Sequence, residues 1–172
     1  MISPATAQLY QQFKHFIQIS PQDACLSGAP LSDGQALDQA LEARCNTLRS
    51  PISRLKTLPS HDALVLLRST LSAPYLMHTL RCAQCHGHPA LQNFDDFLRD
   101  GASSITKSSL TDTQWIQARL PIRNGDQGIR RGTSLAPAAF LASAVSTSDL
   151  QNALLATFGF APDGHFASTR LV

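Results

Sequence analysis

Apolar residues recur every three or four positions between residues 37 and 58, and this spacing constrains the fold more than any other feature. The stripe consists of Leu37, Leu41, Cys45, Leu48, Ile52, Leu55 and Leu58. Residues three or four apart share one face of an α-helix, so the stripe predicts a long amphipathic helix. Ser32 with Gln35 three residues later is typical of a capping box and predicts where this helix begins. Pro51 lies within the stripe, and we expect it to kink or split the helix.

Three further segments favour helices. The apolar members are Leu64, Leu67, Leu71 and Tyr75 in the first, and Leu91, Phe94, Phe97, Leu98, Ala102 and Ile105 in the second. Pro59 opens the first segment and Pro74 interrupts it, while Pro89 is typical of the first turn of the second. The third segment, 135–158, is rich in alanine and leucine. It should form two helices divided near residues 146–149, where Ser148 or Asp149 caps the second.

The whole chain is therefore expected to be all-α, or mainly helical. Leu9, Phe13, Phe16 and Ile17 predict an additional N-terminal helix, and a short β-hairpin near residues 17–31 is the expected exception. A length of 172 residues with 43% hydrophobic residues fits one domain. We expect an N-terminal helix or extension over 1–16, a helical domain over 17–158 and a loose tail over 159–172.

Charge and composition restrict the setting in which the chain works. It carries 14 basic and 12 acidic residues, too small an excess to indicate polyanion binding, although 11 of the basic residues are arginine. The N-terminus lacks a basic region followed by an apolar run, so no secretory signal is expected. No stretch approaches 18 uncharged apolar residues, which argues against a membrane span. We expect an intracellular protein whose four cysteines are free thiols.

A compact group of metal-ligand residues lies between the second and third predicted helices. Cys82, Cys85 and His86 fit the Cys-x-x-Cys-His pattern of covalent haem attachment, and with His88 they offer donors for zinc. Haem of this kind requires an exported chain, and Met77 is too near in sequence to serve as the opposite ligand. Four zinc donors so close together would strain to converge on one ion. We expect a polar turn here, without metal or cofactor.

Catalytic groups are not evident in the sequence. Asp95 and Asp96 form the one adjacent acidic pair in the helical segments, and we expect both in a solvated first turn, where acids favour the helix dipole. Cys25 falls in a turn and Cys45 falls on an apolar stripe, where cysteine usually just packs. The chain is therefore not expected to be an enzyme.

Residues 110–131 say most about function. A short amphipathic turn that contains Trp115, the only tryptophan, ends at Leu120-Pro121 and leads into a glycine-rich loop. The segment carries Arg119, Arg123, Arg130 and Arg131, and after the turn its only acid is Asp126. These arginines favour a surface that faces an anion, with a solvated loop as the alternative. Trp115 is expected to anchor the core rather than to stack on bases.

Three blocks resemble the segment that follows the catalytic palm in reverse transcriptases of non-LTR retrotransposons. They are Leu26-Ser-Gly-Ala-Pro-Leu31, Asp62-Ala-Leu-Val-Leu-Leu-Arg-Ser-Thr-Leu-Ser-Ala-Pro74 with Leu80-Arg81, and the run from Trp115 to Ala142. Their order and spacing carry the resemblance, over about residues 17–155. Where that family usually has Gly-Gly-Leu-Gly-Ile-Arg, this chain has Gly125-Asp126-Gln127-Gly128-Ile129-Arg130. An apolar anchor is lost there and an acid is gained.

The resemblance implies a thumb-like helical domain that grips a nucleic-acid duplex mainly through its backbone. It implies no polymerase activity, because the metal-binding aspartates of a palm are absent. The residues expected to contact duplex are Arg119, Arg123, Arg130 and Arg131, of which Arg130 and Arg131 are taken as exposed, with Arg44, Arg54 and Lys56 as a weaker second strip. The rival interpretation is a helical protein-interaction module that uses the alanine-rich 135–158 region against a partner helix. A small haem or zinc protein built on residues 82–88 is a third alternative.

Overall fold

The computed structural model describes residues 15, 17 and 19–157, and over these residues the protein is mainly helical, as the sequence predicts. The helical segments are η1 (Pro21–Asp23), α2 (Gln35–Leu55), α3 (Ser60–Leu66), η2 (Leu67–Leu71), α4 (Ala73–Cys82), α5 (Pro89–Thr106), α6 (Asp112–Ala118), η3 (Ile122–Asn124) and α7 (Gly132–Thr157). The strands are β1 (Cys25–Leu26) and β2 (Ala29–Pro30). The N-terminal helix predicted over 9–17 and the tail predicted over 159–172 lie outside the described residues, apart from Ile17.

The hairpin lies inside the range expected for it. β1 and β2 pair antiparallel, with Cys25 opposite Pro30 and Leu26 opposite Ala29. Ser27 and Gly28 have φ values of 52° and 76°, the left-handed conformation that a two-residue hairpin turn requires at both positions. Ala29 and Pro30 are buried against the helices, so the hairpin closes one end of the core.

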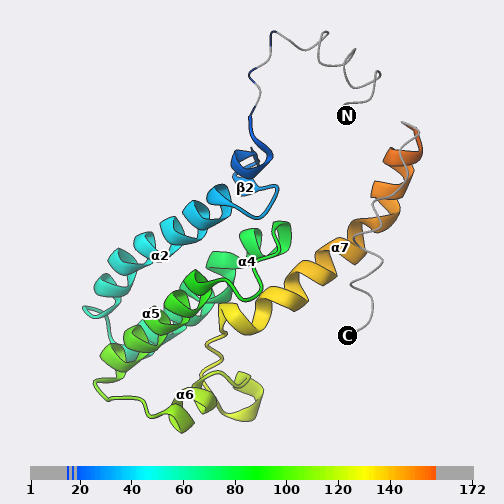
Figure 1. Cartoon of the computed structure of the whole chain (residues 1–172). Coiled ribbons are helices and arrows are strands. Elements are labelled where there is room, and N and C mark those ends of the chain that lie inside the picture. Colours follow the sequence, from blue (N-terminus) through cyan, green and yellow to red (C-terminus); the bar gives the residue numbers. More distant parts are fainter. Residues whose placement is uncertain (1–14, 16, 18, 158–172) are drawn as a thin grey trace.

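The core lies between α2, α4 and α5, and it contains the apolar stripes read from the sequence. Its fully buried side chains include Leu41, Leu48, Leu67, Leu80, Phe94 and Leu98. α2 and α5 approach closely where a Cβ on Gly101 would lie 3.1 Å from Ile52 Cγ2. The first turns of α7 cover α4 and α5, and the rest of α7 extends away from this body (Figure 1).

The expected start of the long helix α2 was wrong, and of the two effects expected at Pro51, a kink or a split, the split does not occur. The helix begins after Gly34 rather than at Ser32, and no side chain caps it. Pro51 lies inside α2 without splitting it. Leu48 and Ile52, on either side of the proline, are both buried, so packing against the core holds the helix together across the missing backbone donor.

The expected interruption at Pro74 is confirmed, and it takes an unusual form. α3 passes into the π-helix η2, which ends at Leu71. Ser72 follows with ψ −128°, and α4 begins at Ala73 with Pro74 in its first turn. Pro89 is the first residue of α5, also as expected. The turn between α4 and α5 therefore lies where the cysteine and histidine residues predicted a polar connection.

Residues 135–157 lie in one helix, so the predicted division near residues 146–149 was wrong. The hydroxyls of Ser146 and Thr147 both donate to the carbonyl of Ser143, and that of Ser148 donates to Val145. These side chains bond to the preceding turn of their own helix instead of capping a new one. No helix within the described residues has the length and apolar character needed to cross a membrane.

Asp95 holds the beginning of α7, which corrects the expectation that both acids of the Asp95-Asp96 pair are solvated. Asp96 is exposed, but only 1% of Asp95 is. One oxygen of the Asp95 carboxylate accepts from the Gly132 amide (2.6 Å). The other accepts from the Thr133 hydroxyl (2.6 Å), the Thr133 amide (3.3 Å) and Arg131 Nε (3.0 Å). Asp95 lies four residues after Leu91 and three before Leu98, so the helical spacing places it on the buried face of α5.

We predict that Asp95→Asn lowers the free energy of unfolding by about 3 to 5 kcal/mol, because Arg131 and the first amides of α7 lose their anionic partner. Urea denaturation followed by circular dichroism measures the change. The matched control is Asp96→Asn, one residue along the same helix, which should change the free energy by less than about 0.5 kcal/mol. Equal losses in the two variants would contradict this role for Asp95.

Candidate nucleic-acid interface

The arginine-rich segment begins with α6, whose start is fixed by a capping box. The Thr111 hydroxyl accepts from the Gln114 amide (3.3 Å), and the Gln114 side chain accepts from the Thr111 amide (2.9 Å). Together these bonds satisfy two donors that a helix start leaves open. Trp115 is buried in the core cluster, which confirms that it anchors the fold. α6 is therefore a fixed base for the loop that follows it.

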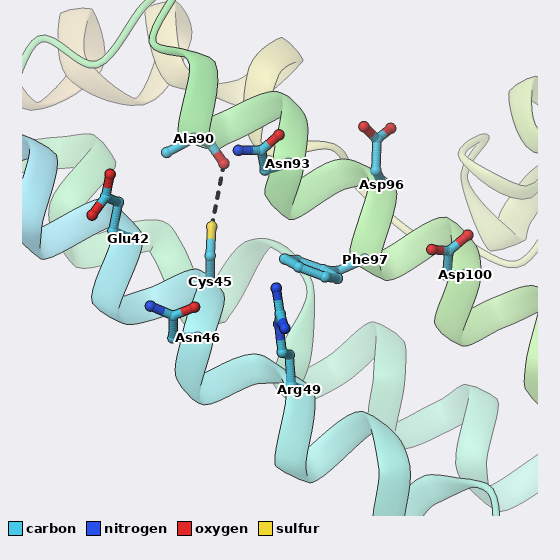
Figure 2. A pocket seen from close by; sticks show the side chains of 9 residues that line it. All are labelled: Glu42, Cys45, Asn46, Arg49, Ala90, Asn93, Asp96, Phe97 and Asp100. Carbon is cyan, nitrogen blue, oxygen red and sulfur yellow. Dashed lines mark hydrogen bonds between the residues drawn. The ribbon is translucent and has the colours of Figure 1, made fainter.

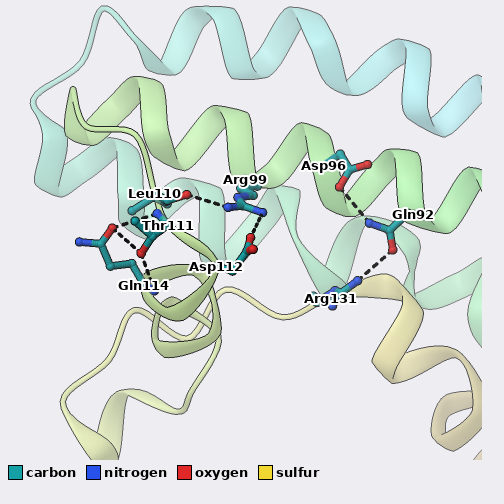
Figure 3. A network of polar contacts seen from close by, with 8 residues as sticks. All are labelled: Gln92, Asp96, Arg99, Leu110, Thr111, Asp112, Gln114 and Arg131. Carbon is teal, nitrogen blue, oxygen red and sulfur yellow. Dashed lines mark hydrogen bonds and ion pairs between the residues drawn. The ribbon is translucent and has the colours of Figure 1, made fainter.

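Arg99 of α5 ties this base to the body of the protein. Its guanidinium donates to the Leu110 carbonyl (2.7 Å) and pairs with Asp112 (2.8 Å), the first residue of α6 (Figure 3). The ion pair is exposed on the Asp112 side, so its energetic value is small. Its effect is to position α6 against α5, and it also offsets the charge of the acid nearest the start of the segment.

The loop after α6 is closed by main-chain hydrogen bonds. The Ile129 amide donates to the Ala118 carbonyl (3.0 Å), and the Gly128 amide donates to the Leu120 carbonyl (3.0 Å). Ile129 is fully buried and fixes the last part of the loop in the core. Between these bonds the chain makes the short turn η3 and reverses at Gly125, with φ 86°. The loop is thus defined by its own backbone, not by its charged side chains.

The structure separates the four loop arginines into two kinds. Arg123 and Arg130 are exposed and Arg119 is half-buried, and none of the three forms an ion pair with an acid in the described part of the chain. Arg131 instead pairs with Asp95 and also donates to Gln92 (2.9 Å) (Figure 3), leaving 24% of its side chain exposed. The expectation that Arg131 is an exposed arginine was therefore wrong.

The weaker second strip is not brought to the loop. Arg44 lies over the Tyr75 ring at 5.4 Å, a cation–π contact with α4. Arg54 and Lys56 are exposed at the C-terminal end of α2. In Figure 1, α5 lies between α2 and α6, so the helix that carries Arg44 and Arg54 does not adjoin the helix from which the loop starts. Any nucleic-acid contact by the second strip would be independent of the loop.

Gln127 places a polar side chain at a partly buried position of the loop. This residue stands where the resembling family usually has leucine. It is half-buried, and its side-chain carbonyl oxygen is buried without a hydrogen-bond donor anywhere in residues 19–157. An acceptor left in this state costs free energy relative to an apolar group of similar size. An apolar side chain of similar size at position 127 would avoid this cost.

The turn between α4 and α5 does not bring its four candidate metal ligands together; these are Cys82, Cys85, His86 and His88. The Cys85 thiol is buried, it donates to the Ala83 carbonyl (3.2 Å), and burial raises its pKa to about 11. The His88 ring accepts from the Ala90 amide (3.1 Å) and hydrogen bonds to Asp38 (2.8 Å). Cys82 is exposed beside His78, 3.9 Å from its Nε2 atom. Within the described residues, no three histidine, cysteine or acidic side chains are placed to hold a metal ion.

A shallow groove between α2 and α5 is a different kind of site (Figure 2). Its charged lining consists of Glu42, Asp96, Asp100 and Arg49, and Arg49 lies over the Phe97 ring at 4.8 Å. Three acids against one arginine do not suit a polyanion. Cys45 on the groove floor donates to the Ala90 carbonyl (3.3 Å), and burial raises the pKa of its thiol. The groove therefore offers neither a phosphate site nor an activated nucleophile.

Comparisons with known proteins add no relative. No protein-family model, curated protein or solved structure matches the chain. The three sequence blocks alone therefore carry the resemblance to reverse transcriptases, which stays a prediction.

We predict that Gln127→Leu raises the free energy of unfolding by about 1 to 3 kcal/mol, because it removes a buried acceptor that has no donor. Thermal and urea denaturation measure the gain. Gln117→Leu is the matched control, since Gln117 is exposed on α6 and the same substitution there should have an effect within about 0.5 kcal/mol. A loss of stability in Gln127→Leu would show that the position requires its amide.

Proposed function

We propose that this chain is a non-catalytic, thumb-like helical unit similar to part of a retrotransposon reverse transcriptase, and that it binds nucleic-acid duplex weakly and without sequence preference. One observation carries the proposal: Arg119, Arg123 and Arg130 lie on a backbone-closed loop and form no ion pair within the described residues. Their charges are available to an external anion. Arginine suits phosphate because its planar fork can donate two hydrogen bonds at once.

The proposed contact is to the phosphate backbone rather than to base edges. Phosphate contacts fix a protein on a duplex without reading its sequence. Three arginines that oppose the single acid Asp126 give the loop a net positive charge, but too few contacts for tight binding at physiological salt. The proposal gives the chain no chemical step, because the sequence lacks the metal-binding aspartates of a polymerase palm.

The test is the salt dependence of binding to a fluorescently labelled DNA duplex of arbitrary sequence. Each phosphate contact contributes about −0.9 to the slope of log affinity against log salt. Three arginines that contact phosphate therefore give a slope of about −2.7 or steeper. Replacing Arg123 and Arg130 together with alanine should flatten it by about 1.8, equally for all sequences. Arg131 is left intact because it also stabilises the fold.

A double variant of Arg81 and Lys107 to glutamine is the control for general loss of positive charge. It should change the slope by less than the loop variant does, because both residues are exposed and neither is among the expected duplex contacts. If the wild-type chain shows no salt-sensitive binding at 50 mM salt, the proposal fails. It also fails if the loop variant and the control variant behave alike.

A second candidate function, a helical protein-interaction module, is favoured by the outer part of α7. Leu141, Val145, Leu150 and Leu154 are exposed, with Val145 67% and Leu150 63% accessible. Asp149 is the only charged residue in the helix. A helix that is apolar on several faces usually lies buried in a larger structure. On this interpretation the helix serves a protein contact and the arginine loop is simply solvated.

The second candidate is tested by measuring whether two copies of the chain associate through α7. If this surface dominates, sedimentation velocity should show concentration-dependent association that persists at high salt, since burial of apolar area is not screened. Val145→Gln should weaken the association at least severalfold, whereas Ser146→Gln at the neighbouring exposed position should not. A monomeric chain that binds duplex with a steep salt slope would favour the first candidate.

A further inference from the structure

Arg68 lies at the base of the arginine loop although it is distant in sequence. It belongs to the π-helix η2, whose backbone is held at the break before α4 by Ser72. The buried hydroxyl of Ser72 donates to the Arg68 carbonyl at 2.6 Å. π-helical turns are rare and widen the helix locally, and they often occur at functional positions. The main chain at Arg68 is therefore fixed in an uncommon geometry beside the loop.

The contact between Arg68 and the loop is made through Gly128. Gly128 has φ +70°, a conformation that favours glycine. A Cβ placed there would lie 3.2 Å from Arg68 Cδ and 3.2 Å from Ile122 Cγ1. The loop backbone thus packs directly on the aliphatic stem of Arg68. A larger residue at position 128 would displace the arginine, which explains why the loop needs glycine here.

The charge of Arg68 has no internal use in the described structure. Its guanidinium takes part in no ion pair and no side-chain hydrogen bond among residues 19–157, in contrast to Arg131. The residue is half-buried, which fits a stem covered by the loop and a charged end that reaches solvent. Arg68 therefore adds a cation beside Gly128 of the loop, whereas Arg131 is paired with Asp95.

We infer that Arg68 is a fourth phosphate-contacting residue of the duplex surface formed with Arg119, Arg123 and Arg130. This inference rests on the proposed function and names a residue of the same site. The surface is then built from two segments, η2 and the loop, which the Gly128 contact holds together. A duplex would be gripped between two structural elements rather than by a single loop.

The experiment compares Arg68→Met, Arg68→Lys and the wild-type full chain on the same labelled DNA duplex between 50 and 200 mM salt. Methionine keeps an apolar stem and removes the charge, and lysine keeps both. Four contacts give a slope of about −3.6 and an affinity loss of roughly 150-fold over this range, whereas three give about −2.7 and roughly 40-fold. We expect Arg68→Met to shift to the three-contact values and Arg68→Lys to stay near the wild-type slope.

The outcomes separate this inference from the proposed function. Salt-sensitive wild-type binding with an unchanged slope in Arg68→Met overturns the role of Arg68 and leaves the loop proposal standing. No salt-sensitive wild-type binding overturns both. If Arg68→Lys flattens the slope as much as Arg68→Met does, the positive charge at position 68 does not set the slope and the inference fails. Arg81→Met, at an exposed arginine in the last turn of α4, is the control, and circular dichroism checks that each variant is folded.

Discussion

The buried carboxylate of Asp95 fixes the arrangement on which the rest of the structure depends. It lies at the N-terminus of α7, where the helix dipole and the open amides favour a negative charge. Gly132 packs there so closely that a Cβ would lie 2.9 Å from Leu76 Cδ1, so the first turn of α7 is held by α5 through charge and by α4 through contact. A buried carboxylate without these partners would be strongly unfavourable. The first turn of α7 is therefore placed jointly, by the carboxylate of Asp95 in α5 and by close packing against Leu76 in α4.

The same interaction determines which arginines remain free. Arg131 neutralises Asp95, so it belongs to the core of the protein and not to its cationic surface. The other end of the segment is also fixed by α5, through Arg99 and the start of α6. Between two ends held by one helix, the loop closes on itself and leaves Arg119, Arg123 and Arg130 without internal partners in the described structure. A loop whose backbone is already ordered loses less conformational freedom on binding than a mobile loop, which helps a site with few contacts.

The sequence was informative where local spacing decides the structure. The stripes of α2 and α5, the hairpin, the break at Pro74 and the burial of Trp115 all follow from residues within a few positions of one another. Ser146 and Ser148 were misread because a hydroxyl can cap a new helix or bond to the preceding turn of its own, and the sequence does not distinguish the two. Asp95 could have been placed correctly from its spacing to Leu91 and Leu98. The approach of Arg68 to Gly128 carries no local signal, because it arises only when η2 and the loop meet in space.

The two candidate functions use surfaces that meet only at the beginning of α7. The arginine loop ends at Arg131, which pairs with Asp95. On α7, Ala139 still packs against the core, and the exposed apolar residues begin beyond it at Leu141. Charge dominates the first surface and its effect is screened by salt, whereas apolar area dominates the second and is not. Both surfaces adjoin the contact between Asp95 and the first residues of α7, so loss of Asp95 would disturb both surfaces. Substitutions in the arginine loop or in the outer part of α7 would each act on a single surface. A contact that survives high salt therefore belongs to α7, and one that disappears belongs to the arginines.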